Sequence, residues 1–136
     1  MTVLDTDGFI DHFRGVEAAT AYIQSLEVGQ RATTDVTIME LYRGATNRDE
    51  LSTIERFLAW NRFTILPVTA VASQQAVQLV KRYTLSHGLG LPDALIAAIA
   101  LETEHTLVTG NVRDFVFIER LHVMRPPYRP QPSQPA

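Results

Sequence analysis

Apolar and polar positions along the chain follow two different periods. Short apolar or β-rich runs between polar residues predict extended segments at 2–4, 31–37, 63–68, 106–109 and 122–124. Apolar residues at helical spacing, together with helix-favouring composition, predict helices at 8–13, 16–26, 38–45, 49–61, 73–86 and 92–102. Because strands and helices alternate, we expect an α/β fold in which helices cover both faces of a parallel sheet.

The predicted helix at 92–102 is apolar on nearly all sides, so we expect it to be buried. It opens with Pro92, a residue suited to the first turn of a helix. In open parallel sheets, ligand sites gather at the carboxyl ends of the strands. The residues that directly follow each strand are therefore the first candidates for chemistry.

Proline marks a change of organisation near the C-terminus. Five of the seven prolines follow Arg125. We therefore expect a domain over residues 1–125 and a proline-rich tail over 126–136 that is extended or disordered. No role is assigned to the tail, and its deletion is expected to leave activity near that of the full chain.

Composition narrows the possible chemistry. A chain of 136 residues that is 46% hydrophobic has room for one domain with a core. The absence of cysteine excludes a disulfide framework, a thiolate zinc site and a thiol nucleophile. The net charge of -3 argues against a generally cationic surface. With neither a signal peptide nor a membrane-spanning run in the sequence, we expect a cytoplasmic protein.

Four acidic residues lie near predicted strand ends: Asp5, Glu40, Asp93 and Asp114. Taken singly, each has an ordinary alternative interpretation as a helix cap, a partner of a helix dipole or a solvated side chain. Together at one sheet edge they would repel one another, so the cluster would need bound cations or raised pKa values. Sites made only of oxygen ligands favour Mg²⁺ or Mn²⁺. Such ions, held by carboxylates, activate water for the hydrolysis of phosphodiesters. Without these four, 11 acids would face 12 bases.

Four motifs give this sequence a family resemblance: VLDTDGFID, IMELYRG, GLGLPDALIAA and TLVTGNVRDF. They resemble the successive motifs of PIN-domain ribonucleases, in particular the VapC-type toxins of type II toxin–antitoxin pairs. The resemblance extends over about residues 2–125. It implies a three-layer α/β/α fold with a small parallel sheet and Mg²⁺- or Mn²⁺-dependent cleavage of RNA. It further implies control by an antitoxin protein and assembly as a homodimer.

The resemblance also assigns roles to single residues. Asp5 and Asp93 match the principal metal-binding acids, and Glu40 and Asp114 match the acids that complete the catalytic, metal-binding cluster. Supporting polar residues of the motifs are matched by Thr6, Thr109 and Asn111. Family members often have a basic residue where this chain has Gly110, so contact with the substrate at this loop is in question.

Three further residues are assigned from their positions. Arg43 and Arg113 lie within the motifs and are candidates for contacts with RNA phosphates, with ordinary surface arginine as the alternative. Asp7 is interpreted as a helix cap rather than a metal ligand.

Two other functions remain as alternatives. The Asp5-Thr6-Asp7-Gly8 sequence also resembles the opening motif of haloacid-dehalogenase-type phosphatases, in which Asp5 would be a nucleophile and Asp7 an acid/base. The paired-acid motif of that family is missing downstream. The second alternative is a catalytically silent PIN-like interaction module, for which a lost acid would be the mark; all four acids are present.

Overall fold

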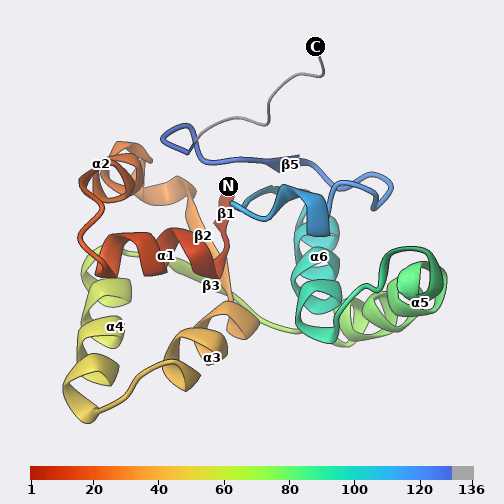
Figure 1. Ribbon diagram of the computed structural model, residues 1–136, viewed down its shortest axis with the longest axis horizontal. Helices are drawn as coiled ribbons and strands as arrows, with labels where there is room; N and C mark the ends of the chain where they lie inside the picture. The colour runs from red at the N-terminus through yellow and green to blue at the C-terminus, as the bar shows by residue number, and fades with distance from the viewer. Residues whose placement is uncertain (130–136) are drawn as a thin grey trace.

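A five-stranded, all-parallel sheet forms the centre of the computed structural model, which describes residues 1–129 (Figure 1). The spatial order of the strands is β3-β2-β1-β4-β5. Their bounds are β1 Thr2–Leu4, β2 Arg31–Thr34, β3 Thr64–Leu66, β4 Thr106–Val108 and β5 Val123–Met124. All four strand pairings are parallel, as the alternation of strands and helices predicted.

Helices cover both faces of this sheet. Their bounds are α1 Thr6–Phe13, α2 Glu17–Ser25, α3 Asp35–Arg43, α4 Arg48–Trp60, α5 Ala70–His87 and α6 Leu91–Thr103. Two short 3-10 helices, η1 Val28–Gln30 and η2 Val112–Asp114, precede β2 and follow β4. In Figure 1, α1 to α4 lie on one side of the sheet and α5 and α6 on the other, which confirms the predicted α/β class with three layers.

Neighbouring strand residues divide the core into two clusters. Val3 of β1 and Leu107 of β4 pack in the cluster with α5 and α6, whereas Leu4 and Val108 pack in the cluster with α1 to α4. All four side chains are fully buried. This is the alternation that a strand covered on both faces requires. The predicted burial of α6 is confirmed, since residues 96–100 are at most 1% exposed.

The prediction of an extended segment over 31–37 is wrong at its C-terminal end. The strand stops at Thr34, and α3 begins at Asp35, three residues earlier than expected. The reason is a side-chain cap, because Thr34 Oγ1 accepts a hydrogen bond from the backbone N–H of Thr37. Thr69 caps α5 in the same way, through the N–H of Ala72.

The prediction of an extended or disordered tail is wrong for residues 126–129. They form a turn in which the N–H of Arg129 donates to the carbonyl oxygen of Pro126 at 3.0 Å, and they contact α1. The remainder of the predicted tail, 130–136, lies outside the described residues. Within residues 1–129, the helices are too short or too polar to cross a bilayer.

Candidate carboxylate site

The strand order places the candidate site at the centre of the sheet. The chain builds outward from β1 through β2 to β3 on one side, and then returns to add β4 and β5 on the other. The order therefore reverses between β1 and β4, the position at which open α/β sheets form a crevice. Asp5 follows β1, and the Thr109–Asp114 loop follows β4, so both lie at this crevice.

Asp5 is buried at the point where β1 meets α1, with 6% of its surface exposed. It is the N-cap of α1, and its Oδ1 accepts the N–H of Thr6 at 2.8 Å. Its Oδ2 accepts the hydroxyl of Thr109 at 2.8 Å. Burial raises the pKa of Asp5 above its ordinary value, although these hydrogen bonds oppose the shift. The capping and site interpretations of Asp5 are thus compatible.

Glu40 reaches Asp5 through a bridging threonine. The hydroxyl of Thr6 donates to Glu40 Oε1 at 2.9 Å, which joins the first turn of α1 to α3. The charge of Glu40 adds to the rise in the pKa of Asp5. The predicted supporting role of Thr6 therefore has a geometric basis.

Asp93, in the first turn of α6, shows that the acids gather at one place. Its pKa is raised from 3.8 to about 6, first by burial and then by the charges of Asp5, Asp114 and Glu40. These charge effects indicate that the four acids lie in the same region of the molecule. They come from the N-cap of α1, from α3, from the first turn of α6 and from η2.

The loop after β4 contributes mainly through Thr109. The Thr109 hydroxyl donates to Asp5 and accepts the backbone N–H of Asn111 at 3.0 Å. Asn111 is exposed, and it joins this network through its backbone N–H. Asp114 lies in η2 with an exposed side chain.

The interpretation of Asp7 as a helix cap is wrong, because Asp5 occupies the N-cap of α1. Asp7 lies in the first turn of α1, and its Oδ2 accepts the N–H of Gly110. The same oxygen is 3.7 Å from Nη1 of Arg129. Burial, and next the charge of Asp5, raise the pKa of Asp7. Asp7 thus binds the loop that follows β4, through the backbone of Gly110.

The donor set has the chemistry of a hard-cation site. Its four carboxylates offer only oxygen ligands, which suit Mg²⁺ or Mn²⁺. Burial and the repulsion among these acids both raise the pKa of Asp93, and a bound cation would stabilise its charged form. Among residues 1–129, no three Asp, Glu or His side chains are already grouped closely enough to hold an ion. The four acids therefore suit a divalent ion in their ligand atoms and in their charge.

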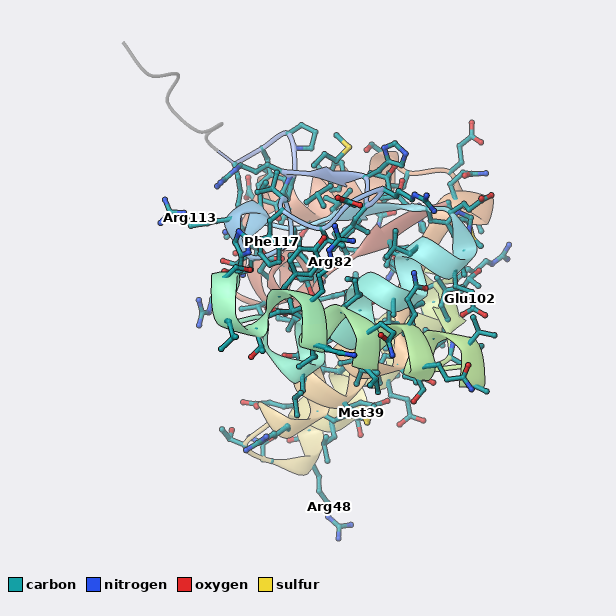
Figure 2. The ribbon with its side chains drawn as sticks, turned by 90° about the vertical axis from the view of Figure 1, so that its right-hand side faces the viewer. Met39, Arg48, Arg82, Glu102, Arg113 and Phe117 are labelled. Atoms are coloured by element: carbon teal, nitrogen blue, oxygen red, sulfur yellow. The ribbon has the colours of Figure 1, made fainter. Side chains whose placement is uncertain are left out.

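Two hollows flank the acids. One has a volume of about 520 Å³ and lies between α1, α3 and α4, with Glu40 in its wall. The other, of about 280 Å³, is lined by Asp93, Asp114 and Arg113, and also by His87 and Phe117. Figure 2 shows Arg113 and Phe117 over the end of α5, with the Arg113 side chain pointing outward. Arg43 is exposed in the last turn of α3, one turn beyond Glu40.

Two features of the site were not predicted from the sequence. His87 and Phe117 are stacked with ring centroids 4.0 Å apart beside the second hollow. Tyr128 and Arg129 contact α1 from the C-terminal segment. The sequence holds one sign of the second feature. Tyr128 is the only aromatic side chain after Arg125, and Arg129 is the only charged one.

Comparison with known proteins agrees with this geometry. Ribonuclease VapC10 of Mycobacterium tuberculosis is 35% identical over 133 residues, covering 94% of this chain and 93% of that protein. Ribonuclease VapC19 of the same organism is 34% identical over 131 residues, covering 94% of this chain and all of that protein. A toxin–antitoxin complex from Klebsiella pneumoniae contains a chain with a TM-score of 0.76 and 28% identity, covering 93% of this chain and 98% of that one. Residues 2–119 match the PIN domain, so the chain belongs to the PIN domain family and groups within it with the VapC ribonucleases.

Proposed function

We propose that this protein is a Mg²⁺- or Mn²⁺-dependent endoribonuclease, the toxin of a toxin–antitoxin pair that acts in the cytoplasm. The observation that supports this most directly is Asp93, whose pKa is raised to about 6 by burial and then by the charges of Asp5, Asp114 and Glu40. The ribonucleases similar to this chain agree with that chemistry. A phosphatase that uses Asp7 fits less well, because Asp7 accepts the N–H of Gly110 and faces Arg129.

Asp5 and Asp93 would hold the principal ion, and Glu40 and Asp114 would complete its shell or bind its waters. A bound divalent ion supplies activation of water and stabilisation of charge on the phosphodiester oxygens. The protein's own contribution is orientation. Thr109 and the N–H of Thr6 fix the two oxygens of Asp5, and the Thr6 hydroxyl fixes Glu40. Each Asp5 oxygen keeps a second lone pair for an ion.

RNA would approach through the hollow beside Asp93 and Asp114. Arg113 lies in its wall and would contact a phosphate, and the stacked His87–Phe117 pair offers a ring surface for a base. Arg43, exposed beyond Glu40, would contact RNA on the other side. The affinity for RNA, measured at several salt concentrations, tests this proposal. Loss of one phosphate contact in Arg113→Gln would reduce the slope of log Kd against log salt concentration by about one.

The groove between α1, α3 and α4 is our proposed site for the antitoxin. Its wall includes the apolar side chains Ile10, Phe13 and Ile54, and Glu40 stands in it as well. An amphipathic peptide could lay its apolar side along this wall and place a basic residue beside the acids.

We also propose a homodimer. The resemblance to the VapC-type toxins implies this assembly, and on α5 the side chains of Val71, Val77 and Leu85 are 58%, 62% and 99% exposed, so a second copy could cover them. The molecular mass in solution, measured by light scattering over a range of concentrations, tests this proposal.

The central test is cleavage of a panel of structured RNAs with Mn²⁺ or Mg²⁺, with and without a chelator. We expect chelation to abolish cleavage, and Asp5→Asn and Asp93→Asn to lower kcat by about 100-fold or more, since a metal contributes several kcal/mol to the transition state. Asp49→Asn is the matched control, because Asp49 is an exposed acid in the first turn of α4. It should stay within about twofold of wild type.

Other outcomes would point to the alternatives. Cleavage that survives both the chelator and the two substitutions would contradict the proposed site. Hydrolysis of small phosphomonoesters without cleavage of RNA would favour the phosphatase. A purified, antitoxin-free protein that hydrolyses neither would favour an interaction module.

A further inference from the structure

The C-terminal segment is bound to the first two helices. After β5, the chain in Figure 1 runs back toward α2. The hydroxyl of Tyr128 donates to Asp11 Oδ2 at 2.9 Å, and the Tyr128 ring lies 5.9 Å from that of Tyr22. Nε and Nη2 of Arg129 donate to the same Asp11 oxygen at 3.0 and 2.6 Å.

Arg129 also offsets the repulsion between two carboxylates on α1. Asp7 and Asp11 are four residues apart on one helix face, and their side chains are each only 16% exposed. Two like charges in this arrangement are unfavourable without a cation between them. The forked guanidinium of Arg129 contacts both, with Nη1 3.7 Å from Asp7 Oδ2 and Nη2 on Asp11.

Gly110 has no side chain at the point where the guanidinium lies. A Cβ built at residue 110 would overlap Asp7 Oδ2 and Arg129 Nη1, and it would lie 2.8 Å from Arg129 Cζ. The guanidinium therefore occupies the space that a side chain at residue 110 would need. Residues 7, 110 and 129 form one close-packed contact.

This contact is linked through Thr109 to Asp5, a candidate metal-binding acid. Asp7 accepts the N–H of Gly110, and the preceding residue, Thr109, donates its hydroxyl to Asp5 at 2.8 Å. The backbone N–H of Asn111 in turn donates to the Thr109 hydroxyl. A displacement of Gly110 would therefore move the threonine that orients Asp5.

We propose that Arg129 is a positioning residue of the nuclease site, which replaces the expectation that the segment after Arg125 can be deleted without loss of activity. Its guanidinium, delivered by the C-terminal segment, holds Asp7 against the N–H of Gly110 and thereby holds Thr109 against Asp5. The effect on RNA cleavage rests on the proposed function. The effect on the loop does not, because it can be measured in metal-free protein.

The test compares Arg129→Gln with wild type and with Arg48→Gln, a control that removes the same charge from an exposed arginine projecting from α4 (Figure 2). We expect Arg129→Gln to lower kcat by about 10- to 100-fold with KM within about twofold, because misplacing a catalytic group lowers the rate more than binding. Arg129→Lys should restore part of the rate, since lysine keeps the charge but not the fork. Arg48→Gln should match wild type.

Amide hydrogen exchange separates positioning from general destabilisation. In metal-free Arg129→Gln, the Gly110 amide should exchange about 10-fold faster or more, while the amide of Leu107, which donates to the carbonyl of His122 within the sheet, stays protected. Equal loss of protection at both amides would mean that Arg129 only stabilises the fold. Unchanged exchange at Gly110 would overturn the proposal, even if the wild-type protein cleaved no RNA and the proposed function failed.

A double-mutant cycle adds a second criterion. Gly110→Ala should lower kcat because its Cβ displaces Asp7 and Arg129. In the double variant with Arg129→Gln, part of that clash is relieved, so the combined loss should be clearly smaller than the product of the two single losses. Strictly multiplicative losses would overturn the direct contact between residues 110 and 129.

Discussion

At the scale of single residues, Asp93 shows the cost of gathering carboxylates. It lies where burial and three neighbouring acids disfavour its charged form and raise its pKa to about 6. An acid with a raised pKa in the folded state destabilises that state once it is ionised. A site that awaits a cation is therefore expected to reduce the stability of the metal-free protein.

Asp93→Asn should therefore stabilise the metal-free protein. In buffer with a chelator at pH 7.5, we expect its Tm to exceed that of wild type by about 2–6 °C, measured by calorimetry. The difference should be full above a pH of about 6 and should be lost as the pH falls below 3.8, where Asp93 becomes protonated in both the folded and the unfolded state.

Addition of Mn²⁺ should reverse this order, because an ion that binds only the folded protein stabilises it. Wild type should gain more in Tm than Asp93→Asn. Equal Tm values in chelator at every pH would show that Asp93 is not in a strained, acid-rich position.

At the scale of elements, the join between α5 and α6 decides where Asp93 lies. α5 ends at His87, its C-cap residue Gly88 has a φ of 62°, and α6 begins at Leu91. The left-handed conformation is available to glycine without strain, and glycine is common directly after the end of a helix. This join directs the first turn of α6, and with it Asp93, toward the crevice between β1 and β4.

Gly88→Ala should destabilise the protein by about 1–2 kcal/mol, the cost of a left-handed non-glycine residue. Gly29→Ala is the matched control. A Cβ at either residue meets nothing within 4 Å, and only Gly88 of the two has a positive φ. Gly29→Ala should stay within about 0.5 kcal/mol of wild type in urea denaturation. Equal effects would show that backbone conformation is not the cause.

At the scale of the whole molecule, the sheet separates two surfaces that meet at the acids. The layer of α1 to α4 forms the larger groove with Glu40 in its wall, and the opposite layer with η2 forms the hollow with Asp93 and Asp114. Under the proposed function, a peptide in the groove and RNA in the hollow would meet only near the acids. A substitution in the groove wall away from the acids would then alter antitoxin binding and not RNA cleavage.

Thr53→Arg should weaken antitoxin binding without changing the nuclease. Thr53 is exposed on α4 in the wall of the groove, where a long side chain would take up space. We expect the Kd for the cognate antitoxin to rise about 10-fold or more, measured by calorimetry, with kcat/KM on RNA within about twofold. Ser52→Arg, one residue away and outside the groove wall, is the control. Unchanged affinity in Thr53→Arg would place the antitoxin elsewhere.

The sequence by itself determined the order of the elements and the main acids. Helical and strand periods are local properties, so the parallel α/β fold and the buried α6 could be predicted from spacing. Asp5 directly follows a strand, and Asp93 lies in the first turn of a helix. Both positions indicate the carboxyl edge of a parallel sheet. A boundary that a side-chain cap decides does not follow from the period, as the start of α3 after Thr34 shows.

Only the tertiary structure decided the parts that depend on distant contacts. The N-cap of α1 is Asp5 rather than Asp7 because Asp7 turns to Gly110, which lies 103 residues along the chain. Arg129 reaches Asp11 across 118 residues and fills the space over Gly110. The period and composition of a sequence hold no information on which side chain fills the space left by a glycine. That assignment exists only once the sheet, α1 and the C-terminal turn are packed together.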